Sequence, residues 1–126
     1  MLDPNIAGAL IRTKALDAKI YSISPNAVVI SSVTAAELQY GFYQRPEAKL
    51  LGSLIGAFLK TIKIVPFDEA AAQVYGELRS QFERSGISVS GIDGLIAAHA
   101  LATDCTLVTK DKAVLKLRPW MRVEEW

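Results

Sequence analysis

Four acidic residues, Asp3, Glu37, Asp93 and Asp111, lie in four successive segments of the chain, each where the chain is expected to turn. In an open α/β sheet, residues just beyond the carboxyl ends of neighbouring strands converge on one crevice although they are far apart in sequence. Carboxylates gathered in this way repel one another and need a cation. Mg²⁺ or Mn²⁺ fits, because hard divalent ions take oxygen ligands from carboxylates, water and phosphate. The pattern therefore predicts a divalent-metal site.

Each acid also has a purely structural interpretation. Glu37 and Asp93 each lie three residues after a Thr or Ser, which is the spacing of a helix capping box. Asp3 and Asp111 follow apolar strand residues, where an aspartate in a turn or a helix cap is common. Any one pair of acids has an ordinary explanation, whereas the four together favour the metal site.

The chain alternates between predicted helices and short predicted strands, which predicts an α/β fold in a single domain spanning residues 1–126. Strands are expected at short apolar runs, and helices where apolar residues recur at helical spacing. Thr34 is the predicted cap of one helix, Pro46 opens another, and Asp68 caps a third that ends near Gly86. The predicted strands are residues 1–2, 27–30, 62–65, 105–109 and 121–123; the helices follow Asp3 and cover residues 34–43, 46 onwards, 68–86 and 92–102.

The composition indicates an ordered globular protein of 126 residues, 51% hydrophobic and 21% charged. This apolar excess predicts that a second copy or a partner covers part of the surface. Cys105 is the single cysteine, so no internal disulfide can form and a reducing cytoplasm is the expected setting. Neither a signal peptide nor a membrane span is expected, because serines, Pro25 and Asn26 interrupt the longest charge-free stretch, residues 20–36.

The formal net charge of +1 excludes a strongly basic nucleic-acid-binding protein. Lysines and arginines are nevertheless concentrated between residues 110 and 122, beginning with Lys110 and Lys112, and they surround Trp120. A basic segment beside an acidic pocket suits phosphodiester chemistry, since cations follow the backbone while metal ions meet the reacting phosphate. A solvated surface around a buried Trp120 is an equally favoured interpretation.

His99 lies among small residues and is predicted to be a partly buried packing residue with one hydrogen-bonded nitrogen rather than a base. No serine or cysteine stands in a nucleophile motif, and none of the 8 glycines falls in a phosphate-binding loop. Metal-assisted chemistry is therefore the leading hypothesis.

The acidic motifs resemble those of the PIN-domain ribonucleases, specifically the VapC-type toxins of bacterial type II toxin–antitoxin (VapBC) pairs. MLDPNI is similar to the first acidic motif of that family, ISSVTAAELQYG to the second, GIDGLIAAHALA to the third and LVTKD to the fourth. The third motif is the most specific, and the closing RVEEW is also usual in the family. The resemblance covers nearly the whole chain.

The resemblance implies a PIN-like domain with a small parallel β-sheet flanked by α-helices. It implies an Mg²⁺- or Mn²⁺-dependent endoribonuclease that cleaves structured RNA, such as a tRNA or a ribosomal RNA loop. It also implies a homodimer and a VapB-type antitoxin that inserts a C-terminal segment into the acidic site of the toxin, giving a toxin–antitoxin hetero-oligomer.

Matched position by position, the resemblance makes Asp3, Glu37, Asp93 and Asp111 the four catalytic acids, and Asp3 and Asp93 the direct metal ligands. The hypothesis is hydrolysis of a phosphodiester by metal-activated water, in which the carboxylates hold one or two ions. Three cationic residues are expected to contact the RNA, namely Lys110, Lys112 and Arg12.

Three features depart from the family pattern. Pro4 replaces the usual Thr or Ser, Lys110 stands where Asn or another polar residue is common, and the chain begins two residues before Asp3, which could leave a charged amine near the site. They leave open a second hypothesis, a catalytically weak or inactive PIN-like module that binds antitoxin or RNA without cutting. A phospho-acceptor signalling domain is disfavoured, because the chain lacks an adjacent acid pair after the first strand.

Overall fold

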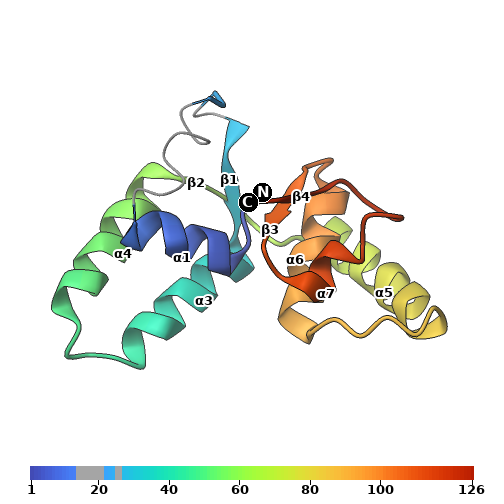
Figure 1. Ribbon diagram of the computed structural model, residues 1–126, viewed down its shortest axis with the longest axis horizontal. Helices are drawn as coiled ribbons and strands as arrows, with labels where there is room; N and C mark the ends of the chain where they lie inside the picture. The colour runs from blue at the N-terminus through green and yellow to red at the C-terminus, as the bar shows by residue number, and fades with distance from the viewer. Residues whose placement is uncertain (14–21, 25–26) are drawn as a thin grey trace.

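A parallel sheet runs through the centre of the molecule (Figure 1). The computed structural model describes residues 1–13, 22–24 and 27–126, so Pro25 and Asn26 lie outside the described residues. Strand β1 (Val29–Ser31) pairs with β2 (Lys63–Val65), and β3 (Leu107–Thr109) pairs with β4 (Val123–Glu125), both in parallel. Leu2 forms parallel bridges with β1 and with β3 and so joins the two pairs. The spatial order β2, β1, Leu2, β3, β4 confirms the expected small parallel sheet.

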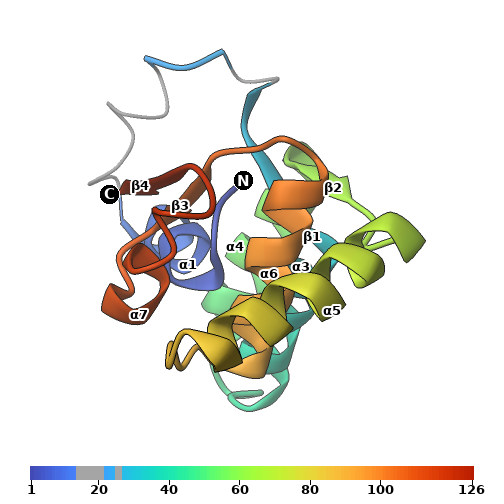
Figure 2. The same cartoon turned by 90° about the vertical axis from the view of Figure 1, so that its right-hand side faces the viewer.

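Helices cover both faces of this sheet. In Figure 1, helices α1 (Pro4–Arg12), α3 (Ser32–Tyr43) and α4 (Lys49–Thr61) lie on one side of the strands. Helices α5 (Glu69–Arg84), α6 (Gly91–Ala102) and α7 (Lys112–Leu115) lie on the other, and Figure 2 shows α5 and α6 side by side. The α/β class predicted from the alternation of elements is confirmed. No helix in the described ranges is long and apolar enough to cross a bilayer.

One apolar core lies on each side of the sheet. The first contains Leu2, Ile6, Ile30, Leu38, Ile55 and Val108 and holds α1, α3 and α4. The second contains Leu78, Phe82, Ile96, Leu107, Val114 and Leu117 and holds α5, α6 and α7.

Polar side chains begin most of the helices. Oxygens of Asp3, Ser31, Asp68, Ser90 and Asp111 each accept a hydrogen bond from a backbone N–H in the first turn of the helix that follows. These bonds satisfy N–H groups that have no partner within the helix. The predicted cap at Asp68 is confirmed. Because three of these caps directly follow or end central strands, the starts of α1, α3 and α7 gather at the carboxyl edge of the sheet.

Thr34 does not cap its helix, contrary to the sequence prediction. Helix α3 begins two residues earlier, after Ser31, whose hydroxyl accepts the N–H of Val33 at 3.0 Å. Thr34 is fully buried and donates its hydroxyl to the carbonyl of Leu2 at 3.3 Å. Glu37 therefore lies in the second turn of α3 and not in a capping box, so its structural interpretation is wrong.

Pro46 does not open a helix either. It is in a turn that is closed by a 3.0 Å hydrogen bond from the N–H of Ala48 to the carbonyl of Arg45, and α4 starts at Lys49. Proline suits this place because its fixed φ matches the second position of a turn. The last strand begins at Val123 rather than Met121, because the N–H of Met121 still bonds to Leu117 after α7. The short helix α7 was not predicted.

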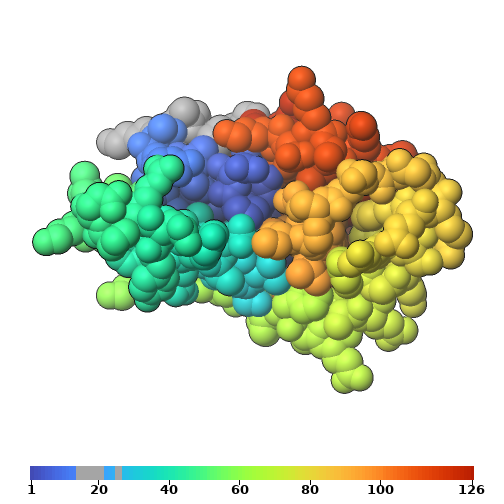
Figure 3. All heavy atoms as spheres, turned by 90° about the horizontal axis from the view of Figure 1, so that it is seen from below, coloured from blue at the N-terminus to red at the C-terminus, as the bar shows by residue number. Residues whose placement is uncertain are grey.

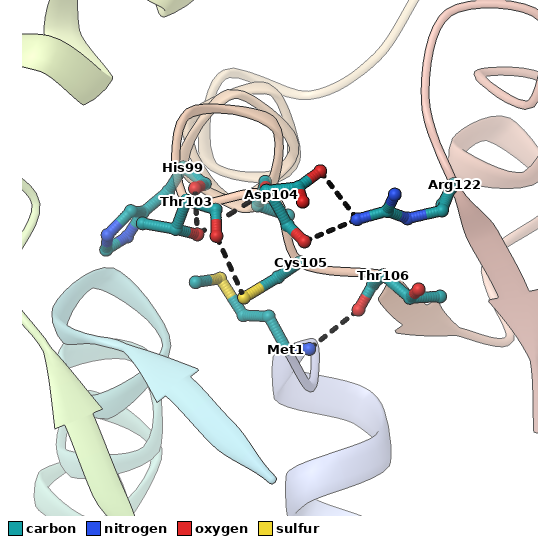
Figure 4. Close-up of polar contacts among 8 residues, drawn as sticks. Met1, His99, Thr103, Asp104, Cys105, Thr106 and Arg122 are labelled. Carbon is teal, nitrogen blue, oxygen red and sulfur yellow. Dashed lines mark hydrogen bonds and ion pairs between the residues drawn. The ribbon is translucent and has the colours of Figure 1, made fainter. Parts of the chain in front are cut away.

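Contacts at the amino-terminal end of β3 hold Met1, the residue before the bridging Leu2, in place (Figure 4). The amine of Met1 donates to the carbonyl of Thr106 at 2.6 Å, and burial lowers the pKa of this amine. Arg122 donates to Oδ1 of Asp104 at 2.7 Å and ties the approach of β4 to the turn after α6. The terminal amine is therefore bonded at the opposite end of β3 from Thr109, whose hydroxyl bonds to Asp3.

Candidate active site

Asp3 is a buried carboxylate at the centre of the carboxyl edge of the sheet. Its side chain is 3% exposed. Oδ1 accepts the N–H of Ile6 at 2.7 Å, which begins α1, and Oδ2 accepts the hydroxyl of Thr109 at 2.5 Å. Burial raises the pKa of Asp3, and the negative charge of Asp93 adds to this, while the bonds from Thr109 and Ile6 act in the opposite direction. Among the described residues, Asp3 thus has no cation paired with it.

Asp93 approaches Asp3 from the first turn of α6. The hydroxyl of Ser90 donates to Oδ2 of Asp93 at 2.6 Å and accepts the N–H of Asp93 at 3.1 Å. Ser90 therefore caps α6 as predicted, but the reciprocal bond of a capping box is absent, because the Asp93 carboxylate bonds to the Ser90 hydroxyl and not to its backbone N–H. This cap does not exclude a site role for Asp93, because the Asp93 charge also acts on the pKa of Asp3. Oδ1 of Asp93 accepts no hydrogen bond from the described residues.

Asp111 is connected to Asp3 through Thr109. Its N–H donates to the Thr109 hydroxyl at 2.9 Å, and that hydroxyl donates to Asp3. Oδ1 of Asp111 accepts the N–H groups of Ala113 and Val114 at 2.7 and 3.2 Å, so it caps α7 as its structural interpretation predicts. Asp111 is half-buried.

Glu37 lines a hollow that begins beside Asp3. It is half-buried on α3, and the hollow, of about 350 Å³, lies between α1, α3 and α4 and is also lined by Pro4, Asn5 and Arg12. Across the described residues, no hydrogen bond or ion pair links Glu37 to the other three acids. Pro4 and Asn5 directly follow Asp3, so the hollow begins beside the buried carboxylate.

The segments that carry the acids meet on one face of the molecule. In Figure 3, the blue start of the chain, the cyan start of α3, the orange start of α6 and the red-orange segment before α7 border one another. In the part of the chain that the structure describes, no three His, Cys, Asp or Glu side chains stand close enough together to form a metal cluster by themselves. The charge of Asp93 acts on the pKa of Asp3, so these two acids are the pair that could hold a cation.

Thr109 is a site residue that the sequence analysis did not find. It ends β3, is fully buried, and joins Asp3 to Asp111. A signal was present in the motif LVTKD, where the threonine follows two buried strand residues and precedes the acid by two positions.

The predicted RNA contacts lie on the surface near these acids. Lys110 and Lys112 are exposed on either side of Asp111, and Arg12 is exposed in the last turn of α1. Two other cations of the basic segment are paired, Arg118 with Glu125 at 3.9 Å and Arg122 with Asp104 at 2.7 Å.

Trp120 packs edge-on against Phe82, with ring centroids 5.9 Å apart and an interplanar angle of 80°. It is half-buried and packs against the apolar core beside α5. The structural interpretation of a buried tryptophan is therefore confirmed only in part.

His99 is a packing residue in α6 as predicted, but it is fully buried rather than partly buried. Its Nδ1 shares a 2.8 Å hydrogen bond with the hydroxyl of Ser31, and its ring meets Phe67 edge-on at 5.4 Å. Nε2 makes no well-formed hydrogen bond with the described residues. Burial lowers the pKa of His99, although the charge of Asp68 and the carbonyl of Pro66 oppose this. Because the ring is fully buried, it is out of reach of a substrate.

Comparison with known proteins places this arrangement in a family. The family model of the PIN domain matches residues 1–118. Ribonuclease VapC2 of Rickettsia felis is 37% identical over 80% of this chain and 75% of its own length. The tRNA(fMet)-specific endonuclease VapC of Shigella flexneri is 33% identical over 100% of this chain and 96% of its own.

A solved structure supports the same assignment. The crystal structure of VapBC2 from Rickettsia felis bound to a DNA fragment from their promoter contains a chain with a TM-score of 0.88 and 31% identity. The similarity covers 100% of this chain and 97% of that one. The chain therefore belongs to the PIN-domain family, among its VapC members.

Proposed function

We propose that this protein is the toxin of a VapBC-type toxin–antitoxin pair and acts in the cytoplasm as an Mg²⁺- or Mn²⁺-dependent endoribonuclease. Its substrate is a structured RNA, such as a tRNA or a ribosomal RNA loop. Family membership supports the nuclease chemistry. The observation that carries the proposal is the buried carboxylate of Asp3 at the carboxyl edge of the sheet, with the Thr109 hydroxyl bonded to it and the charge of Asp93 acting on it.

The donor set at this edge fits a hard divalent cation. A carboxylate has about four acceptor directions, and each oxygen of Asp3 uses one of them. Oδ1 of Asp93 accepts no hydrogen bond from the described residues, and the repulsion between the two acids would be relieved by a positive charge. Asp3 and Asp93 would hold the ion. When bound, Mg²⁺ or Mn²⁺ lowers the pKa of a coordinated water and offsets charge on the phosphate.

The protein's own contribution is to hold these groups in position. Thr109 and Ile6 fix the two oxygens of Asp3, and Ser90 fixes one oxygen of Asp93. Fixed carboxylates need little reorganisation when charge develops in the transition state. Asp111 and Glu37 would complete the acidic site at its rim.

The cations outside the acidic edge would bind the RNA backbone. Lys110 and Lys112 flank Asp111 on the surface, and Arg12 lies beside the hollow that Glu37 lines. Ammonium and guanidinium groups contact phosphates without reading sequence, so these residues would set affinity rather than specificity.

A VapB-type antitoxin and a second copy of this chain are the proposed protein partners. The Rickettsia felis relative was solved as VapBC2 on promoter DNA. Large apolar side chains on α3 and α4 are unusually exposed here, with Tyr43 at 71% and Leu50 at 74%. Exposed apolar groups close together are typical of protein interfaces.

The second hypothesis, an inactive module, gains no support from Pro4. Proline occupies the first position of α1, where an N–H has no partner within the helix in any case. Asp3 still caps the helix through the N–H of Ile6.

Cleavage of an RNA pool tests the proposal. Purified protein free of antitoxin is incubated with total bacterial RNA and Mg²⁺ or Mn²⁺, beside Asp93→Asn, an EDTA sample and Glu77→Gln. Glu77 is an exposed acid on α5 and controls for the loss of one charge. Discrete fragments with the wild type and Glu77→Gln only are expected, and their ends name the substrate. Absence of cleavage together with absence of metal binding would favour the inactive module.

A further inference from the structure

A hollow of about 360 Å³ opens beside the candidate active site and takes no part in the metal chemistry described above. It lies between the second half of α5, the segment of residues 86–90 and the first turn of α6. On the face shown in Figure 3, the yellow end of α5 and the yellow-orange segment after it lie beside the orange start of α6. The volume falls at the lower end of the range for small-ligand sites, about 300–1,000 Å³, so the hollow has room for a ligand as small as one nucleobase.

Tyr75 and Arg79 lie together on one wall of the hollow. The guanidinium of Arg79 lies over the Tyr75 ring at 5.9 Å from its centroid and donates to the Tyr75 hydroxyl at 2.8 Å. Glu83 holds the other side of the guanidinium at 3.1 Å. The Arg79 side chain is 60% exposed, so this surface is open to a ligand. Planar guanidinium and aromatic groups are the surfaces on which unpaired bases stack.

Glycine at position 94 lets this surface lie close to α6. A Cβ at Gly94 would stand 3.3 Å from Cε2 of Tyr75, which is tighter than an ordinary contact. The Tyr75 ring therefore rests against the helix turn that carries Asp93.

The opposite wall offers hydrogen-bonding groups for a base edge. Residues 88–90 run without helix or strand, and within the described chain the backbone N–H groups of Ser88, Val89 and Ser90 donate to no other protein group. The Ser88 side chain is exposed beside them. Phe82, which is buried, and Ile87 supply the apolar floor. The hollow thus combines a stacking surface with free donors, as base-binding pockets do.

Ser90 connects this hollow to the acids. It lines the hollow and donates its hydroxyl to Oδ2 of Asp93 at 2.6 Å. A base in the hollow would belong to the same stretch of RNA as a phosphate held between Asp93 and Asp3.

We infer that the hollow between α5 and α6 binds one unpaired nucleobase of the RNA next to the phosphate that is cut. This inference rests on the proposed ribonuclease function, and it names the form of the substrate, a loop or strand with an unstacked base at the cleavage site. The base stacks on the Tyr75 and Arg79 surface, and its edge meets the backbone of residues 88–90.

An NMR titration tests the pocket without relying on catalysis. The ¹⁵N-labelled protein is held in EDTA and titrated with short single-stranded RNA of mixed sequence, and separately with an abasic ribose-phosphate oligomer of equal length. Gly86, Gly91 and Gly94 line the hollow, whereas Gly8 and Gly41 line the hollow on the other side of the sheet. The RNA should shift the first three amide signals, and the abasic oligomer should leave them in place.

Variants separate stacking from other effects. Tyr75→Ala should weaken the RNA titration about tenfold, the size expected when one base can no longer stack on an aromatic ring. Tyr75→Phe keeps the ring and should bind like the wild type. Arg79→Ala removes the guanidinium from the hollow and should also weaken binding, and Arg84→Ala, which removes a cation on α5 that bonds to Ser80 outside the hollow, is its matched charge control. Unchanged glycine signals outside the hollow show that each variant is folded.

RNA that shifts other signals while the three pocket glycines stay in place would overturn the inference and leave the proposed nuclease intact. An equal response to the abasic oligomer would also overturn it. RNA that shifts no signal at all would overturn the inference, and the cleavage assay then decides separately whether the nuclease proposal stands.

Discussion

Thr109 donates its hydroxyl to Oδ2 of Asp3 at 2.5 Å across 106 positions of the chain. The same hydroxyl accepts the N–H of Asp111 at 2.9 Å, so one buried side chain connects two of the candidate acids. A hydrogen bond donated to a carboxylate favours its charged form, and this bond opposes the burial that raises the pKa of Asp3. Thr109 therefore favours the charged form of Asp3, which is the form that binds a cation.

Replacing Thr109 by valine should weaken both stability and activity. Thr109→Val keeps a similar shape but removes the hydroxyl, so Asp3 loses a donor and the N–H of Asp111 loses its acceptor. The free energy of unfolding should fall by about 1–3 kcal/mol in urea denaturation. Metal-dependent cleavage should fall at least about tenfold, as when a residue supporting a ligand is removed. Thr109→Ser should restore both, and wild-type behaviour of Thr109→Val would show that the bond is unimportant.

Asp3 should give the metal-free protein an unusual pH dependence of stability. Burial, and then the charge of Asp93, raises the pKa of Asp3 above its ordinary value of 3.8, despite the bonds from Thr109 and Ile6. The folded protein therefore binds more protons here than the unfolded chain. The stabilising contribution is complete below pH 3.8 and is lost as the pH rises through the folded-state pKa.

Urea denaturation in EDTA from acid to neutral pH checks this effect. The free energy of unfolding of the wild type should fall relative to that of Asp3→Asn as the pH rises. A difference between the two proteins that is flat with pH, or that changes in the other direction, would show that the carboxyl is not disfavoured by folding.

Lys110 and Lys112 should contribute to RNA affinity by binding phosphates. Both are exposed beside Asp111. Lys110→Gln or Lys112→Gln should weaken binding in EDTA and reduce the slope of log K against log salt concentration by about 0.7 for each phosphate that is no longer neutralised. Lys60→Gln, in the last turn of α4, is the matched control and should leave the slope unchanged. If all three variants give the wild-type slope, the backbone path lies elsewhere.

His99 should matter for stability and not for the chemistry. His99→Ala removes the bond to Ser31 and the packing against Phe67 and leaves a cavity, so the free energy of unfolding should fall by about 2–4 kcal/mol. The pH profile of cleavage by the folded protein should stay unchanged. A stable His99→Ala protein with an abolished or shifted pH profile would assign the histidine a catalytic role instead.

Local sequence signals predicted much of the fold. Apolar runs located the strands to within a few residues, and Asp68 and Ser90 were recognisable as caps because each precedes an apolar helical pattern. The motif Ser31-Ser32-Val33-Thr34 was ambiguous, because each hydroxyl residue is a good cap. The choice of Ser31 depends on where β1 ends, which is a property of the sheet and not of the helix.

The site was harder to predict than the fold. The acids were found by their residue type, but the place of Glu37, in a hollow lined also by Pro4 and Asn5, follows from the three-dimensional path of α3. The link through Thr109 requires β3 to lie next to the first residues of the chain. Strands so far apart in the sequence pair without any local sequence pattern that predicts the pairing.

The most direct test couples metal binding to RNA cleavage in the same samples. Bound Mn²⁺ is measured by electron paramagnetic resonance, and cleavage of the RNA identified from the pool is followed alongside, for the wild type, Asp3→Asn, Asp93→Asn and Glu77→Gln. The wild type and Glu77→Gln should bind Mn²⁺ and cut in proportion to the metal bound, while both aspartate variants should lose at least about tenfold in each property. Cleavage that persists in EDTA, or in Asp93→Asn without bound metal, would contradict a metal site built on Asp3 and Asp93.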